Sequence, residues 1–292
     1  MSASSSESES LVTPGKVSES SQAPASAEGS VSSQRQASAE ARVEAPRPQK
    51  PRRTRKSRVS PNLHPEGSLR VRYRIRFSKT DLLRWISHRD LASLWERIGR
   101  RVGLPFSMTE GFHPKPRLMF PSALPLGVES LDEVVDLELD REWDESELLG
   151  KLREDQQPGL AIHHATRVDL TEGKARLAGR QYRVTLPDDF NGAERSQVEL
   201  AIEQLKGSGT ITIDRKGKDV VTHVPTQIPS LELQADCLVA RLVNGEAASL
   251  KIHDILDLLS ISDWPDRGTT LIRTHTFLRG EEMPSSDSTK HS

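Results

Sequence analysis

The sequence predicts an α+β fold: two tandem ferredoxin-like modules, each with the element order β-α-β-β-α-β, after a disordered N-terminal arm. The arm, residues 1–68, is rich in Ser, Ala, Glu and Pro, so it has too little apolar surface to offset the entropy of folding. From residue 69 onward, alternating segments typical of strands and segments of helical spacing follow that order, and a similar series with an insertion comes after it. We therefore expect modules at 69–169 and 180–279 and a polar tail at 280–292.

The first module begins with a strand at 70–77, where Arg alternates strictly with Val, Tyr, Ile and Phe. The next helix begins at Ser87, whose hydroxyl can accept a hydrogen bond from the backbone near Asp90. Gly103 is suited to the position after the last turn of that helix, and Gly127 to a tight turn that requires a positive φ. The remaining elements are short extended pieces at 106–108 and 117–120, a strand at 134–139, a helix from Asp144 to about Asp155 and a strand at 160–168.

The second module has the same elements plus an inserted hairpin. We expect strands at 181–186, 231–234, 237–243 and 270–277, helices at 193–205 and 249–259, and the hairpin at 210–214 and 220–224. The one cysteine of the sequence, Cys237, lies in an alternating run, so we interpret it as a packed thiol on a strand. A single thiol excludes an internal disulfide, a Cys-rich zinc site and a self-contained iron–sulfur cluster.

The net charge of −1 conceals two halves of opposite sign. Residues 1–118 hold 22 Lys and Arg against 11 Asp and Glu, whereas residues 119–292 hold 19 against 31. The arginines of the first strand, Arg70, Arg72, Arg74 and Arg76, share one face and would repel one another unless an anion lies across them. With the basic cluster at 47–58, they predict an RNA partner. The alternative is a solvated sheet face that the acidic half neutralises.

Four short motifs follow one another along the first module: Arg-Phe-Ser-Lys at 76–79, Ser-His-Arg-Asp at 87–90, Gly-Phe-His-Pro-Lys-Pro at 111–116 and Leu-Pro-Leu-Gly-Val-Glu at 124–129. On these motifs, residues 70–279 resemble the uncharacterised radical-SAM-linked domain family, which in bacteria is fused to a radical SAM protein or encoded beside one. The resemblance implies a radical SAM protein as partner. It places the iron–sulfur cluster and the S-adenosylmethionine on that partner and no cofactor on this chain, and it supplies no catalytic residue.

The third of these motifs predicts a stiff, basic loop, because each Pro restricts itself and the residue before it. Phe112 could stack on a base, while Lys115 and Arg117 project from the loop. The alternative is a structural loop whose Phe112 is buried. The candidate nucleic-acid contacts are Arg72, Arg74, Arg76, Lys79, Arg89, Phe112, His113, Lys115 and Arg117.

His88 is the one candidate catalytic residue. It lies at a helix N-terminus, where the helix dipole favours the neutral imidazole, so it could act as a general acid or base. The alternative is an ordinary surface histidine. His113 stands where the related family usually has Asn, which argues against an obligatory acid–base role for it. Two imidazoles without a third ligand at a diagnostic spacing do not define a zinc site, so we predict no metal.

The leading hypothesis is an accessory protein of a radical SAM enzyme that binds or presents tRNA or rRNA for modification. The alternatives are an RNA-processing or RNA-modifying enzyme that uses His88, and a protein-docking module without RNA contact. The sequence contains no apolar signal segment and no run long enough to span a membrane, so we expect a cytoplasmic protein without membrane contact.

Overall fold

The computed structural model describes residues 69–215, 217, 219–245 and 249–283. The arm at 1–68, with its basic cluster, and residues 284–292 of the predicted tail lie outside the described residues. The described elements are β1 (Val71–Lys79), η1 (Asp81–Trp85), α1 (His88–Arg101), β2 (Leu118–Met119), β3 (Val128–Leu139), α2 (Glu145–Arg153), β4 (Leu160–Val168), η2 (Leu170–Glu172), β5 (Leu177–Thr185), α3 (Gly192–Gly207), β6 (Thr210–Asp214), β7 (Asp219–His223), α4 (Val224–Gln227), β8 (Ser230–Leu233), β9 (Cys237–Val243), α5 (Ile252–Leu258), η3 (Trp264–Arg267) and β10 (Leu271–Leu278).

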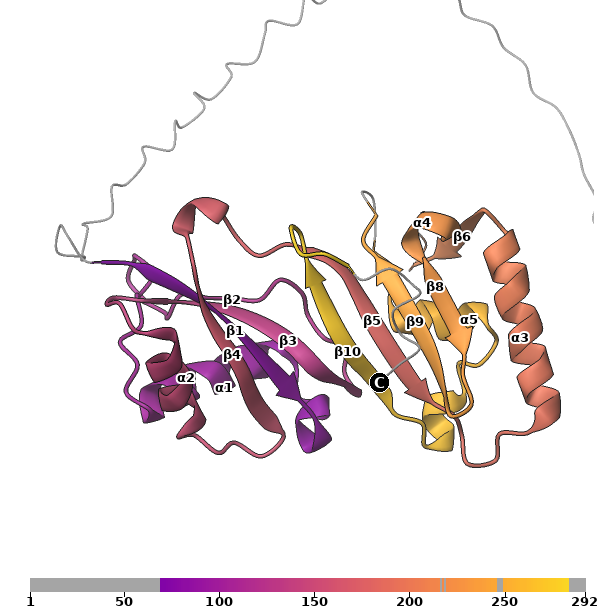
Figure 1. Ribbon diagram of the computed structural model, residues 1–292, viewed down its shortest axis with the longest axis horizontal. Coiled ribbons are helices and arrows are strands. Elements are labelled where there is room, and N and C mark those ends of the chain that lie inside the picture. The colour runs from indigo at the N-terminus through magenta and orange to yellow at the C-terminus, as the bar shows by residue number, and fades with distance from the viewer. Residues whose placement is uncertain (1–68, 216, 218, 246–248, 284–292) are drawn as a thin grey trace, which may run out of the picture. The chain divides into compact units, whose positions relative to one another are not determined.

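One eight-stranded mixed sheet runs through the described residues, in the order β4-β1-β3-β10-β5-β9-β8, with β2 paired to β3 outside this path (Figure 1). Its neighbouring strands are antiparallel, except that β3 and β10 are parallel. The hairpin of β6 and β7 is separate from this sheet and matches the predicted insertion. The α+β class is therefore confirmed.

β3 is the strand that joins the two halves of the sheet. Along one edge it pairs with β1, from Leu139 to Ser130. Its other edge is divided, because Leu137 and Asp136 pair with β2 while Val128 and its neighbours pair with β10. The strand predicted at 134–139 is therefore too short. Two separate ferredoxin-like modules are not confirmed, since a single sheet continues from one half into the other.

Two hydrophobic clusters lie along the sheet, each covered by its own pair of helices. α1 and α2 enclose a cluster that includes Tyr73, Phe77 and Trp95, while α3 and α5 enclose one that includes Tyr182 and Trp264. Figure 1 shows the first pair of helices beside β1, β3 and β4 and the second pair beside β8 and β9. The apolar residues of β1 thus face the helices, as alternation predicts, and its arginines face away from them.

The local signals at the ends of α1 are confirmed. The Ser87 hydroxyl accepts a hydrogen bond from the backbone of Asp90 at 3.2 Å. The same hydroxyl donates a hydrogen bond to the Asp90 carboxylate at 2.7 Å. Gly103 follows the helix with a φ of 70°, which a residue with a side chain rarely adopts.

Cys237 is buried on β9, and burial raises the pKa of its thiol. Among the described residues, no helix is both long and apolar enough to cross a membrane.

Candidate nucleic-acid interface

The arginines at the start of β1 are paired with a carboxylate of β3. Arg70 and Arg72 share Glu138, with nitrogen–oxygen distances of 2.7 and 2.9 Å. Arg72 also donates to the carbonyl oxygen of Gly173 and is only 6% exposed. Neither the side chain of Arg72 nor that of Glu138 faces open solvent, so this pair is part of the folded structure.

The next two arginines of β1 have the same kind of partner. Arg74 forms a two-pronged ion pair with Asp136, through contacts of 2.8 and 3.0 Å. Arg76 contacts Asp132 at 2.7 Å and Glu281 at 2.6 Å. All of these carboxylates come from the acidic half of the chain. The expectation of unpaired guanidinium groups on this face is therefore wrong, and the face is neutralised in the way that the alternative interpretation described.

The pairing makes a prediction about acid stability. Burial opposes ionisation of Glu138, but the hydrogen bonds and the positive charges of Arg72 and Arg70 together outweigh it and hold the pKa of this carboxyl below its usual value. A carboxyl with a lowered folded-state pKa stabilises the protein above its unfolded pKa, about 4.3 for Glu, and this contribution disappears as the pH falls through the folded pKa. We expect Glu138→Gln to lower the free energy of unfolding at pH 7 and to have a smaller effect near pH 3, measured by urea titration. Glu203→Gln, at an exposed pair on α3, is the control; an equal loss at both pH values would contradict the prediction.

Lys79 is not a surface residue. Its side chain lies on the helix-covered face of the sheet, is 1% exposed, and donates to the carbonyl oxygen of Ile86 at 3.3 Å. Burial lowers the pKa of its amine. The predicted phosphate contact of Lys79 is therefore wrong, because the alternation of β1 directs this residue toward the core.

The start of α1 presents His88 and Arg89 to solvent. The His88 ring packs edge-to-face on Phe120, with 5.1 Å between ring centres. Within the described residues His88 has no hydrogen-bond partner that would orient it as a general acid or base. Likewise, no group of three or more His, Cys, Asp or Glu residues there is placed to hold a metal ion.

Residues 108–116 form a short hairpin-like excursion that carries the Gly-Phe-His-Pro-Lys-Pro motif. The backbone of Thr109 donates to the carbonyl oxygen of Lys115 at 2.8 Å, and the Thr109 hydroxyl accepts from the backbone of Lys115 at 3.0 Å. Phe112 lies at the tip and is 99% exposed, and His113 and Lys115 are exposed beside it. The alternative of a buried Phe112 is therefore excluded.

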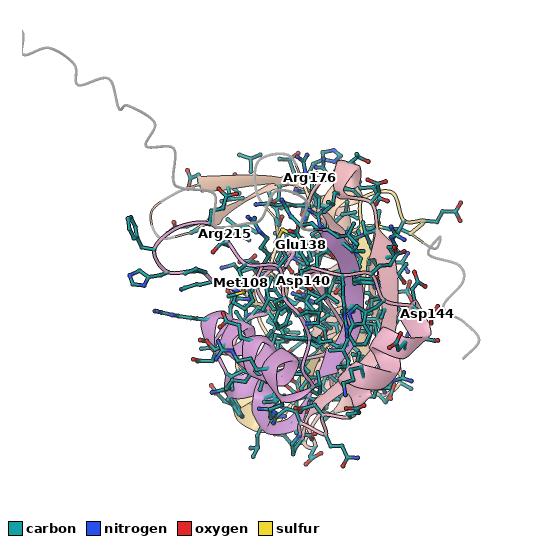
Figure 2. All side chains as sticks on the ribbon, turned by 90° about the vertical axis from the view of Figure 1, so that its left-hand side faces the viewer. Met108, Glu138, Asp140, Asp144, Arg176 and Arg215 are labelled. Carbon is teal, nitrogen blue, oxygen red and sulfur yellow. The ribbon has the colours of Figure 1, made fainter. Side chains whose placement is uncertain are left out.

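Arg117 supports the base of this hairpin. Its Nε donates to the carbonyl oxygen of Met108 at 3.0 Å, and it lies 3.9 Å from Glu138. Figure 2 labels Met108 and Glu138. The half-buried Arg117 is thus engaged by the fold, whereas Lys115 forms no ion pair within the described residues.

The sequence interpretation missed an exposed apolar surface that lies on η1 and the turn before β3. It consists of Leu82, Trp85 and Leu126, all more than half exposed. Gly127 has a φ of 78°, as predicted for a tight turn, and a Cβ at this position would lie 3.0 Å from the Trp85 ring. In the sequence, this surface could have been recognised from two large apolar residues of η1, Leu82 and Trp85. These residues do not share the helical spacing of the apolar residues of α1.

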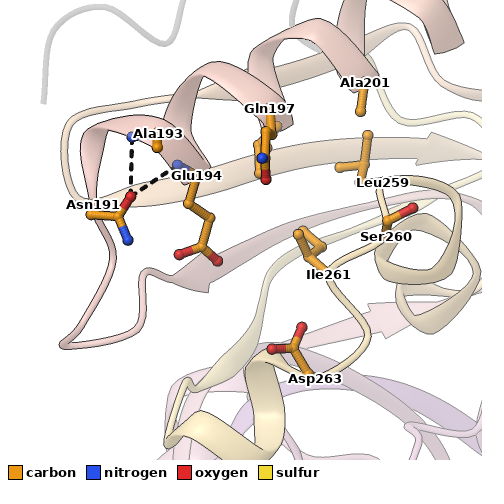
Figure 3. Close-up of a pocket in the computed structure, with 10 residues that line it drawn as sticks. Asn191, Ala193, Glu194, Gln197, Ala201, Leu259, Ser260, Ile261 and Asp263 are labelled. Carbon is orange, nitrogen blue, oxygen red and sulfur yellow. Dashed lines mark hydrogen bonds between the residues drawn. The ribbon is translucent and has the colours of Figure 1, made fainter.

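A cavity of about 560 Å³ lies between the start of α3 and the segment after α5 (Figure 3). Two of the polar side chains that line it, Asn191 and Glu194, serve the fold. Asn191 accepts from the backbone of Ala193 and Glu194, and so caps α3. Glu194 accepts from Arg267 at 2.6 Å and from the indole of Trp264 at 3.0 Å. These two side chains thus have structural roles.

The described region is thus an α+β domain with a mixed sheet and an exposed aromatic hairpin. Residues 72–252 match the family "Uncharacterized protein conserved in bacteria (DUF2344)", and the chain belongs to this family. No curated protein matches the sequence.

Among solved structures, a chain of a Cbf5–Nop10–Gar1 complex is similar, with a TM-score of 0.36 and 11% identity over 70% of this chain and 48% of that one. A chain of an H/ACA RNP bound to a substrate RNA containing 2′-deoxyuridine has a TM-score of 0.34 and 10% identity, over 70% and 47%. The chain spans about half the length of each.

Proposed function

We propose that this protein is a non-catalytic accessory subunit of a radical SAM enzyme and binds unpaired nucleotides of tRNA or rRNA with the hairpin at 108–116 and the start of α1. The partner is proposed from the four motifs of the first half, and the iron–sulfur cluster and S-adenosylmethionine belong to that partner. We also propose that the two halves are fused ferredoxin-like modules. This is supported by their equal strand orders, β4-β1-β3-β2 and β10-β5-β9-β8. Sheets of this kind commonly carry single-stranded RNA.

The observation that carries the proposal is the full exposure of Phe112 on a braced loop. An aromatic side chain costs free energy in water unless it contacts something, and large apolar residues at such positions mark binding sites. Because the two Thr109–Lys115 hydrogen bonds and the prolines hold the loop, little conformational entropy is lost when a base stacks on the ring.

Exposed cations of α1 and of the hairpin suit a phosphate backbone. Arg89 and Arg97 are exposed on α1, and Lys115 is exposed on the hairpin. None of the three forms an ion pair within the described residues, in contrast to the arginines of β1. α1 contacts the segment that contains the hairpin at two points, through His88 on Phe120 and through Gly99 against Phe106.

The test is the affinity for a labelled single-stranded RNA of about 12 nucleotides, measured by fluorescence anisotropy at several salt concentrations. We expect Phe112→Ala to weaken binding by roughly 5- to 150-fold, the loss of about 1–3 kcal/mol for one stacked base. Lys115→Ala should reduce the slope of log affinity against log salt by about 0.7.

The matched control is Leu200→Ala, which removes another exposed apolar side chain, on α3, and should leave the affinity unchanged. Binding that is insensitive to salt, or an equal affinity for Phe112→Ala and the unaltered protein, would refute the proposed function.

A further inference from the structure

A basic pocket of about 250 Å³ lies where the segment after η2 meets the end of β10. Its ionisable lining side chains are four cations and one carboxylate, those of Arg74, Lys174, Arg176, Arg279 and Glu172. Arg74 is already neutralised by Asp136, and the nearby Glu281 contacts Arg76. The volume is below the roughly 300–1,000 Å³ of sites for drug-sized molecules, so the pocket suits a small group.

Three of the cations in this basic pocket are open to a ligand. Lys174, Arg176 and Arg279 are exposed, and none of them forms an ion pair within the described residues. Set against the single carboxylate of Glu172, these three cations leave a net charge of +2 at the pocket. Like charges that line one small pocket repel one another, and an anion bound among them removes this repulsion. The lining therefore selects an anionic ligand.

The backbone around the basic pocket is held by the fold. The backbone of Arg279 donates to the carbonyl oxygen of Arg176 at 2.8 Å, so these two arginines lie on adjacent segments. The carbonyl oxygen of Gly173 accepts from the guanidinium of Arg72, which fixes the segment after η2 against β1. Because these segments are already in place, little backbone entropy is lost when an anion binds.

The same contacts connect the basic pocket to the hairpin at 108–116. Arg72, which holds Gly173, is paired with Glu138 at 2.9 Å, and Glu138 lies 3.9 Å from Arg117 at the base of that hairpin. The pocket therefore adjoins the part of the surface that carries the exposed Phe112. This position favours a nucleotide, which has a base as well as a phosphate, as the source of the anion.

We propose that the basic pocket binds the phosphate monoester of a nucleotide, either at the end of a single-stranded RNA or in a free nucleotide. A phosphate monoester carries about −1.5 to −2 charges at pH 7, which matches the pocket, whereas a carboxylate carries only one. The planar guanidinium groups of Arg176 and Arg279 can each donate two hydrogen bonds to phosphate oxygens. Where the phosphate ends an RNA, the inference rests on the proposed function and adds a second contact to that of Phe112.

The test compares ligands that differ only in a phosphate, with the full chain. One set is a single-stranded RNA of about 12 nucleotides with hydroxyls at both ends, and the same RNA with a phosphate at its 5′ or its 3′ end, measured by fluorescence anisotropy with an internal label. The other set is adenosine monophosphate and adenosine, measured by calorimetry. In at least one set, we expect the phosphate to strengthen binding by roughly tenfold or more, as for hydrogen bonds between charged groups.

Arg176→Ala and Arg279→Ala should each remove most of the gain from the phosphate. The matched control is Lys206→Ala, which removes an exposed cation of α3 and should leave the gain unchanged. A gain for adenosine monophosphate alone would assign the pocket to free nucleotides. The inference fails if the phosphate strengthens binding in neither set, or if Arg176→Ala has no greater effect than Lys206→Ala. RNA binding that still depends on Phe112 would then leave the proposed function intact.

Discussion

Replacing Glu133 by Gln is expected to lower the free energy of unfolding by about 3–5 kcal/mol, because it leaves buried positive charge without a partner. Glu133 is buried and contacts Arg273 at 2.8 Å, and Arg273 is fully buried. Lys79, also buried, is stabilised in its charged form by the same carboxylate. Among the described residues, the other hydrogen-bond partners of Arg273 are neutral oxygens, those of Tyr182 and Ser122, each at 3.2 Å.

Urea titration at neutral pH measures this effect. The control is Glu142→Gln, which removes one partner of the ion pair with Arg167, where both side chains are about half exposed. A pair of this kind contributes at most about 1 kcal/mol. Equal losses for the two variants would show that the Glu133 carboxylate does not balance the buried cations.

Gly99→Ala is expected to destabilise the protein by about 1–3 kcal/mol, although Ala is the better helix former. Gly99 lies within α1, and a Cβ there would come 2.1 Å from the ring of Phe106. This distance is far below van der Waals contact, so either the helix or the ring must move. Since Phe106 leads into the hairpin at 108–116, the same substitution should also weaken RNA binding.

The matched control is Gly150→Ala in α2, where a Cβ would meet nothing within 4 Å. There we expect the ordinary helix preference to stabilise the protein by up to about 1 kcal/mol. Thermal unfolding of both variants compares them directly. The double variant Gly99→Ala, Phe106→Ala should be less destabilised than the sum of its single changes. Stabilisation by both glycine replacements would contradict the packing described for α1.

Local patterns in the sequence predicted most of the elements and the ends of several of them. Alternation identified β1 and β9, and the caps at Ser87 and Asp144 and the positive φ of Gly103 and Gly127 were all predicted from single residues. These features depend on neighbours along the chain, which the sequence displays directly. The pairing of β3 with β10 depends instead on residues far apart in sequence, and no local signal specifies it.

The neutralised arginine face shows how the candidate site was misjudged. Alternation also places Asp136 and Glu138 on one face of β3, so the sequence contained an acidic ladder to match that of β1. Only the strand pairing, which sets Arg72 opposite Glu138 and Arg74 opposite Asp136, shows that the two ladders meet. By contrast, the exposed aromatic motif around Phe112 was predicted, because prolines and glycine fix that backbone locally.

The placement of β10 between β3 and β5 has a consequence for synthesis on the ribosome. Before translation has passed residue 278, the part of β3 near Val128 and one edge of β5 have no β10 to pair with. Open strand edges readily pair with other chains. We therefore expect the emerging polypeptide to pass through a stage at which these strand edges can pair with neighbouring nascent chains.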